Sequence, residues 1–339
     1  MKKVYILLSM IAVIVFCSSC NDEWKDEQYE QYISFKAPIN NLGVTSIYIP
    51  YYSDQKVSYQ LPVIVSGSTD NDKNITVHVG VDSDTLRILN KERFQDREDH
   101  HYKELTSEYF SMPETVNINA GENIGLMQID FSLQGIDLVS NWLLPLTIME
   151  DESYGYEAHP RKNYKKALLH VIPFNEYSGP YSGTALKIYS KGYENLTPIV
   201  KRTIETYVVD ESTMFFYAGN VDHNRKGRED YKINLKFESL TEKQGEDGDF
   251  GNVLLSPASD DNRINFKLNQ TASYVITEMM DAVRPYLKHR YVTISNIDYE
   301  FTDYTDVEGE EFVYIVSGTL IQERKINTQI PDQDQAIEW

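Results

Sequence analysis

The chain has almost no cysteine. Among its 339 residues only Cys17 and Cys20 are cysteines, and both lie in the first twenty positions. Residues 21–339 therefore offer no disulfide, no thiol nucleophile and no thiolate ligand for zinc. Stability has to come from apolar burial and strand pairing, for which a hydrophobic content of 41% is ample.

Positive charge is also scarce. The sequence holds 32 Lys and Arg against 52 Asp and Glu, which gives a formal net charge of −20. Binding to nucleic acid or to an anionic lipid surface needs a basic footprint, so both are excluded as partners. A neutral ligand is compatible with this charge.

Long apolar runs are missing after residue 20. The run Val4–Cys17 follows Lys2 and Lys3 and is shorter than the roughly 20 residues that span a bilayer. With the small residues before Cys20 it resembles the lipoprotein signal of Bacteroidetes. We expect removal of residues 1–19 and acylation of Cys20, which makes the lipid the only membrane contact. A plain signal peptide and an N-terminal membrane anchor remain alternatives.

The residues after Cys20 are acidic. Asp22, Glu23, Asp26 and Glu27 form a cluster that resembles the export signal of Bacteroidetes surface lipoproteins. Residues 20–34 are therefore interpreted as an acidic tether. The expected location is the outer membrane, lipid-anchored and facing the cell exterior. An ordinary solvated linker is the alternative.

The rest of the chain is predicted to be all-β and to form two domains. Short strands separated by turns, such as the alternating residues 75–82, predict an Ig-like β-sandwich over 35–173. One helix is expected at 83–94, with Ser83 as its cap. Gly and Pro cluster after an apolar strand near 174, and longer strands then predict an antiparallel β-barrel-like domain over 174–339. A weak helix is expected near 275–287.

Five segments carry a family resemblance: LPVIVSG (61–67), VHVGVDSDTLRILN (77–90), NWLLPLTI (141–148), FNEYSGPYSGT (174–184) and RKINTQIPDQDQAIEW (324–339). The first three resemble the Ig-like BT_3987-like N-terminal domain of Bacteroidetes lipoproteins. The last two resemble the BT_3044-like C-terminal domain. The resemblance implies a surface protein of a glycan-utilisation locus that captures an oligosaccharide or polysaccharide beside TonB-linked importers and partner lipoproteins. It implies no particular binding residues.

Catalytic motifs are absent. The sequence has no HExxH, GxSxG, P-loop or strand-linked GxGxxG pattern, so no enzyme activity and no cofactor are expected. The acidic stretches 70–74 and 246–249 lack a complete calcium-loop pattern and are read as polar turns, so no metal is expected either. With 52 acids present, however, sequence alone does not exclude a pair of catalytic carboxylates.

One loop combines the side chains that sugar recognition uses. Tyr217 could stack on a sugar ring, and Asp222, His223, Asn224 and Arg225 could hydrogen-bond to hydroxyls. The expected ligand is a neutral oligosaccharide. Tyr-rich stretches at 189–195 and 299–304 are weaker candidates, and a plain hairpin tip is the alternative for all three. The rival function is a structural or adhesin-type lipoprotein that contacts protein.

Overall fold

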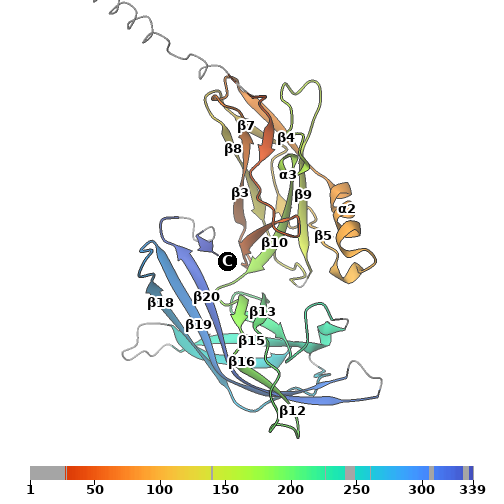
Figure 1. Ribbon diagram of the computed structural model, residues 1–339, viewed down its shortest axis with the longest axis vertical. Helices are drawn as coiled ribbons and strands as arrows, with labels where there is room; N and C mark the ends of the chain where they lie inside the picture. Colours follow the sequence, from red (N-terminus) through yellow and green to blue (C-terminus); the bar gives the residue numbers. More distant parts are fainter. Residues whose placement is uncertain are drawn as a thin grey trace, which may run out of the picture.

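The computed structural model describes residues 27, 29–138, 140–225, 227–240, 249–259, 261–304, 309–330 and 336–338. Figure 1 shows two β domains stacked along the long axis of the molecule, with the described N-terminal end at the top of the first domain and the second domain below it. The all-β expectation is confirmed.

The first domain is a sandwich of two sheets. One has the strand order β1-β3-β8-β6, and the other has the order β2-β10-β9-β4-β7 with β5 beside β9. Alternation along β8 shows how the sequence makes such a sheet, since Met127, Ile129 and Phe131 are buried between more exposed neighbours. The strands are β1 Ile33–Phe35, β2 Thr45–Pro50, β3 Val57–Val65, β4 Ile75–Val81, β5 Lys103–Glu104, β6 Phe110–Ser111, β7 Thr115–Ile118, β8 Ile124–Phe131, β9 Trp142–Ile148 and β10 Lys166–Phe174.

Helix α2 (Ser83–Phe94) lies against the outside of the six-stranded sheet through Leu86 and Leu89. Its range is as expected, but the expected cap is wrong. The N-cap is Asp82, whose Oδ1 accepts a hydrogen bond from the Thr85 backbone N–H at 3.1 Å. The first domain also contains the short segments η2 (Glu98–His100) and α3 (Lys162–Lys165).

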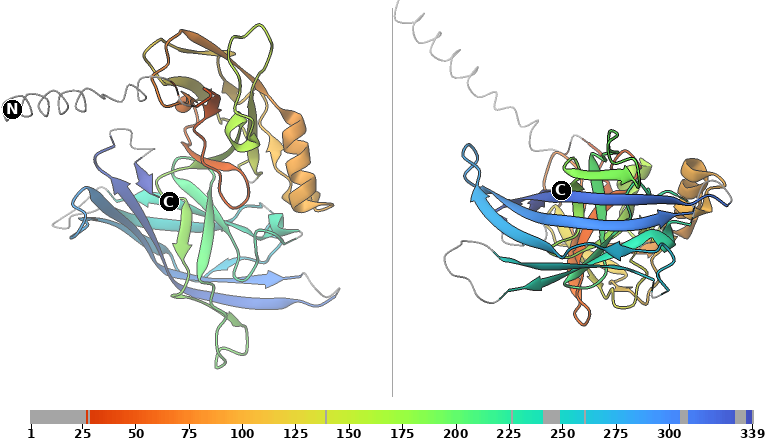
Figure 2. Two further views of the ribbon diagram at one scale, coloured as in Figure 1. Left: turned by 45° about the horizontal axis from the view of Figure 1, so that its top comes forward. Right: turned by 90° about the horizontal axis from the view of Figure 1, so that it is seen from below.

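The second domain is an antiparallel barrel, as Figure 2 shows. Eight strands pair in the closed order β20-β11-β13-β14-β15-β16-β18-β19, because β19 also pairs with β20. The barrel-like expectation is confirmed. The strands are β11 Gly179–Ser182, β12 Leu186–Ser190, β13 Thr203–Val208, β14 Thr213–Tyr217, β15 Lys232–Ser239, β16 Phe250–Pro257, β17 Lys267–Leu268, β18 Ala272–Met280, β19 Leu287–Asp303, β20 Phe312–Asn327 and β21 Ile337–Glu338, with the 3-10 turn η3 at Arg228–Tyr231.

The helix expected near 275–287 is wrong. Residues 272–280 form β18, which pairs with β19 from Ser273–Ser295 to Met280–Lys288. The local helix propensity of this stretch is overridden because Tyr274 and Ile276 fill the barrel core.

Candidate functional site

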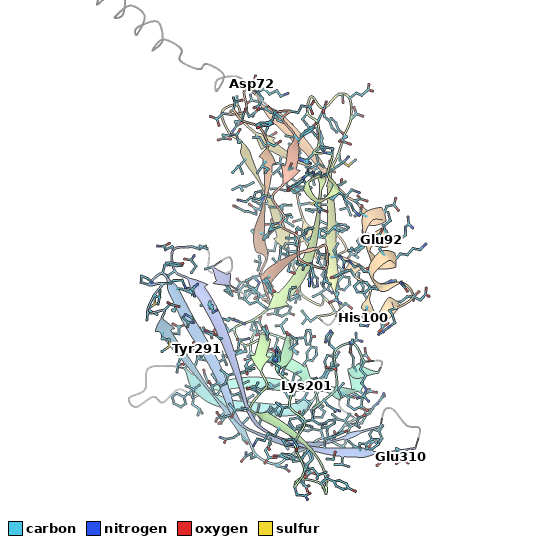
Figure 3. The ribbon with its side chains drawn as sticks, viewed as in Figure 1. Asp72, Glu92, His100, Lys201, Tyr291 and Glu310 are labelled. Atoms are coloured by element: carbon cyan, nitrogen blue, oxygen red, sulfur yellow. The ribbon has the colours of Figure 1, made fainter. Side chains whose placement is uncertain are left out.

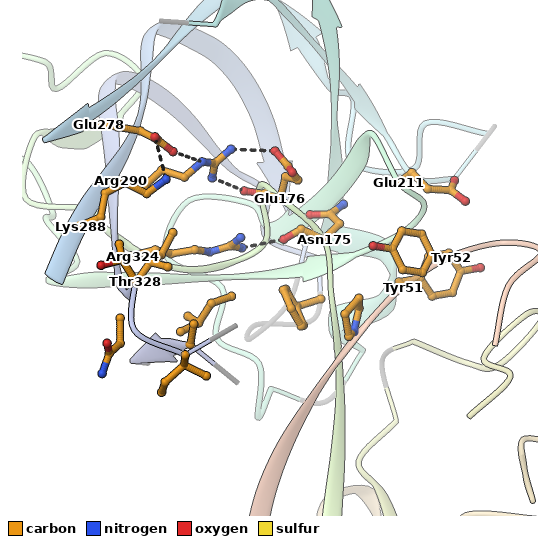
Figure 4. A pocket seen from close by; sticks show the side chains of 17 residues that line it. Tyr51, Tyr52, Asn175, Glu176, Glu211, Glu278, Lys288, Arg290, Arg324 and Thr328 are labelled. Atoms are coloured by element: carbon orange, nitrogen blue, oxygen red, sulfur yellow. Dashed lines mark hydrogen bonds and ion pairs between the residues drawn. The ribbon is translucent and has the colours of Figure 1, made fainter. Parts of the chain in front are cut away.

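A pocket of about 550 Å³ lies where the two domains meet. The first domain contributes the end of β2 and the residues after it, and the second contributes the connection, strands β18 to β20 and the C-terminal tail (Figure 4). The lining residues are Pro50, Tyr51, Tyr52, Phe174, Asn175, Glu176, Glu211, Glu278, Lys288, Arg290, Arg324, Ile326, Asn327, Thr328, Ile330, Ala336 and Ile337. Small-molecule sites commonly occupy such domain interfaces.

The connection between the domains is a turn held by hydrogen bonds of the Asn175 side chain. The Asn175 side-chain oxygen accepts hydrogen bonds from the backbone N–H groups of Tyr177 (2.9 Å) and Ser178 (2.8 Å). Its amide nitrogen donates to the carbonyls of Asp210 (2.6 Å) and Thr213 (3.1 Å). Asn175 is buried, so these contacts fix one wall of the pocket without help from solvent.

Arg324 holds the same turn from the barrel side. Its guanidinium donates to the carbonyls of Asn175 (2.6 Å) and Ser178 (2.5 Å) and lies 5.6 Å from the centre of the Phe174 ring. Burial, with the nearby charge of Arg290, lowers the pKa of Arg324 to about 10, so it stays protonated at neutral pH. The two stretches that resemble the BT_3044-like domain, 174–184 and 324–339, therefore meet in this pocket.

An ion network covers the next part of the wall. Arg290 donates to the carbonyl and to the carboxylate of Glu176, both at 2.9 Å, and lies 3.8 Å from Glu278. Lys288 donates to Glu278 at 2.9 Å. With Glu211 and Arg324 the pocket holds three acids and three bases, so it is close to neutral although the chain is strongly acidic.

Aromatic rings stand across the pocket from this network. Figure 4 shows Tyr51 and Tyr52 on the side away from Arg290 and Glu278. Tyr51 is 9% exposed and Tyr52 is 43% exposed. Burial raises the pKa of Tyr51, and the carboxylates of Glu211 and Asp210 add to the effect, so its hydroxyl stays protonated. A partly exposed ring opposite hydrogen-bonding groups suits a neutral, hydroxyl-rich ligand.

The loop expected to bind sugar lies elsewhere and is partly filled. Tyr217 is only 6% exposed, and its ring packs edge-on against Phe215 and Tyr207. Tyr217, Asp222 and His223 do line one hollow, but its volume is about 50 Å³, well below the roughly 300 Å³ at which ligand pockets begin.

The other two residues of that loop have structural partners. Arg225 makes a two-pronged contact with Asp303, at 2.9 and 2.7 Å, and lies 5.0 Å from the centre of the Tyr231 ring. The carbonyl of Asn224 accepts a bond from Arg97 of the first domain at 3.4 Å. Sugar binding by this loop stays a prediction, and its geometry favours a structural role.

The weaker Tyr-rich candidates differ from each other. Tyr193 is 62% exposed in the turn after β12. Tyr299 and Phe301 are fully buried on β19, where they fill the barrel core. Among the described residues, no group of three His, Cys, Asp or Glu side chains could hold a metal ion.

The anchor and most of the acidic cluster, Cys20, Asp22, Glu23 and Asp26, lie outside the described residues. Glu27 is described, and its carboxylate accepts bonds from the backbone N–H groups of Ser68 (2.7 Å) and Thr69 (3.1 Å). These bonds, that from Ser68 above all, hold the pKa of Glu27 well below its usual range. In the part of the chain that the structure describes, no helix is long and apolar enough to cross a membrane.

Sequence reasoning missed the pocket residues Tyr51, Tyr52, Arg290 and Arg324. Two signals were present: paired tyrosines at the end of a strand, and an arginine at the start of a tail segment that resembles a known family. Neither signal shows that residues so far apart in the chain meet in space.

Comparison with known proteins relates both domains to Bacteroides proteins. A model described as a domain of unknown function, DUF4973, matches residues 24–152, and a second, described as a C-terminal domain, matches residues 165–321. A Bacteroides ovatus structure of unknown function is 43% identical with a TM-score of 0.78, covering 91% of this chain and 100% of that one. An auxiliary nutrient binding protein from Bacteroides thetaiotaomicron is 42% identical with a TM-score of 0.76, covering 90% of this chain and 100% of that one. No curated protein matches the chain.

Proposed function

The chain belongs to the same family as the Bacteroides proteins to which it is 42% and 43% identical. We propose that it is a surface nutrient-binding protein that holds a neutral oligosaccharide between its domains. The observation that carries this proposal is the pocket itself. It combines the exposed ring of Tyr52 with a charge-balanced wall of hydrogen-bonding groups. The relative described as an auxiliary nutrient binding protein supports a nutrient-binding role.

Binding without turnover is part of the proposal. A glycosidase needs a carboxylic acid that stays protonated near neutral pH opposite a second carboxylate. In the pocket, Glu278 and Glu176 are engaged by Arg290 and Lys288. The pKa of Glu211 is lowered, because its carboxylate accepts hydrogen bonds from Ser53. A carboxylate with a lowered pKa, such as that of Glu211, makes a poor general acid, whereas all three carboxylates can accept hydrogen bonds from hydroxyls.

A lipid anchor at Cys20 would place this pocket at the end of the protein that is far from the membrane. The first described residue, Glu27, contacts Ser68 and Thr69. These two residues are close to Asp72 in the sequence. Figure 3 shows Asp72 at the end of the first domain remote from the barrel. A protein tethered there would hold its pocket away from the membrane, facing incoming glycan, beside a TonB-linked importer and partner lipoproteins.

A second candidate function is binding to another protein, and one exposed apolar surface supports it. The turn after β12 exposes Tyr193 (62%), Leu196 (59%) and Ile199 (44%). Exposed apolar groups that gather in one place favour a protein partner. A structural or adhesin-type role would use this turn and leave the interdomain pocket without a ligand.

We expect Tyr52→Ala to weaken oligosaccharide binding by about 5- to 150-fold, because loss of a stacked ring and its hydroxyl costs about 1–3 kcal/mol. Wild-type affinity should lie in the micromolar to millimolar range, roughly −4 to −8 kcal/mol. The measurement is isothermal calorimetry on residues 21–339 with a panel of neutral homo-oligosaccharides of glucose, xylose, mannose and galactose.

Tyr193→Ala is the matched control, since it removes an exposed tyrosine ring from the second candidate surface. It should bind like wild type. Loss of binding in Tyr193→Ala with full retention in Tyr52→Ala would contradict the assignment of the pocket, and absence of binding to the whole panel would count against a neutral glycan ligand.

A further inference from the structure

A second hollow, of about 450 Å³, lies on the first domain beside the interdomain pocket. It opens between β2 and β3, at the edge of the sandwich where the two sheets part. Its lining residues are Lys36, Pro38, Ser46, Ile47, Tyr48, Ile49, Pro50, Val57, Ser58, Tyr59, Gln60, Pro62 and Ile337. Two of these, Pro50 and Ile337, also line the interdomain pocket, so the two hollows adjoin.

The strand arrangement explains why this edge is open. β1 is three residues long and pairs with β3 only at Val63–Val65, so the first part of β3 has no paired strand on that side among the described residues. β2 is the edge strand of the other sheet. Pro38 and Pro62 lie along the opening, and proline cannot donate a ladder hydrogen bond. The edge is therefore poorly suited to receive a further β-strand.

The lining resembles that of the interdomain pocket in its chemistry. Tyr48 and Tyr59 are partly buried, with Tyr59 packed against the core of the sandwich, and Gln60 and Lys36 are exposed along the same hollow. Burial is the main cause that raises the pKa of Tyr48 and of Tyr59, so both hydroxyls stay protonated. Rings flanked by amide and hydroxyl groups again suit a neutral polyhydroxylated ligand.

We propose, on the premise of the function proposed above, that the ligand is a linear oligosaccharide long enough to occupy both hollows, with the first domain as a second binding subsite rather than a spacer. The interdomain pocket holds one end of the chain, between Tyr52 and Arg290. The following sugar units pass Pro50 and Ile337 and lie against Tyr59. Continuity of the two hollows and their shared chemistry support this placement.

The test is a chain-length series. Calorimetry on residues 21–339 compares the disaccharide and the hexasaccharide of each homo-oligosaccharide in the panel above. We expect the hexasaccharide to bind about 10- to 100-fold more tightly, because the second subsite adds a ring contact and hydrogen bonds. Tyr59→Ala should reduce this advantage to a few-fold and leave disaccharide binding unchanged, whereas Tyr59→Phe keeps the ring and should keep most of the advantage.

Gln60→Ala tests the second subsite independently, in case Tyr59→Ala fails to fold. Gln60 is exposed, so its truncation leaves the core intact. It should weaken only the hexasaccharide, about threefold or more. Equal affinity for both chain lengths in the wild type, with the Tyr52→Ala effect intact, would overturn the second subsite and leave the proposed function standing. No binding at either length would remove the proposed function itself.

Discussion

Replacing Arg225 by alanine is expected to destabilise the barrel by about 3 kcal/mol. The Arg225 side chain is 17% exposed, and that of its partner Asp303 is only 6% exposed. Removing one member of a buried, two-pronged ion pair leaves the other charge desolvated and costs about 3–5 kcal/mol. The lower figure applies here because Arg225 retains some solvent contact.

Hydrogen exchange with mass spectrometry measures this effect in the second domain. Peptides from β19 and β20 should lose about a hundredfold in protection, which corresponds to about 3 kcal/mol. Asn224→Ala changes an exposed neighbour and should stay within about 0.5 kcal/mol of wild type. Arg225→Lys keeps the charge without the two-pronged contact and should fall between them. Unchanged protection in Arg225→Ala would contradict the structural role of the pair with Asp303.

Replacing Cys20 by alanine is expected to abolish membrane attachment in a Bacteroidetes host. The wild type should partition into detergent, because each buried CH₂ of an acyl chain contributes about 0.8 kcal/mol and several chains make dissociation negligible. The variant should remain in the aqueous phase, which a Triton X-114 partition measures directly. Equal partitioning of both proteins would refute acylation at this residue.

We expect surface display to depend on the acidic cluster that follows Cys20. Neutralising Asp22, Glu23 and Asp26 together should protect the protein from protease added to intact cells, since it would stay in the periplasm. Glu27 should be left unchanged in this test, because its carboxylate accepts hydrogen bonds from Ser68 and Thr69 and its loss would disturb the first domain. Protection of the wild type itself would argue against surface display.

Local patterns predicted the strands well where alternation and turn residues agree. Residues 75–82 were expected as a strand, and the structure has Ile75–Val81 with Val77 and Val79 buried. The cap of α2 was misplaced by one residue, since Ser83 and Asp82 are both good caps by type. The helix prediction for 275–287 was wrong because the conformation of this stretch depends on pairing with β19, and no local pattern shows that pairing.

The candidate site was harder to predict, because it depends on how the domains dock. The loop from Tyr217 to Arg225 has the composition of a sugar site, yet Tyr217 packs against its own sheet and Arg225 pairs with Asp303. Tyr52 and Arg324 line one pocket because the two domains dock, and Arg324 itself contacts the turn at Asn175 that connects them. Composition indicates which residues could bind a sugar, whereas burial decides which are available.

A crystal structure of residues 21–339 soaked with the tightest-binding hexasaccharide tests the central claim most directly. We predict ligand density between the domains, with one sugar ring against Tyr52, hydroxyls within hydrogen-bond distance of the Arg290 network, and the chain continuing past Pro50. Density at the loop 217–225 or at the turn carrying Tyr193, with the interdomain pocket filled only by solvent, would contradict it.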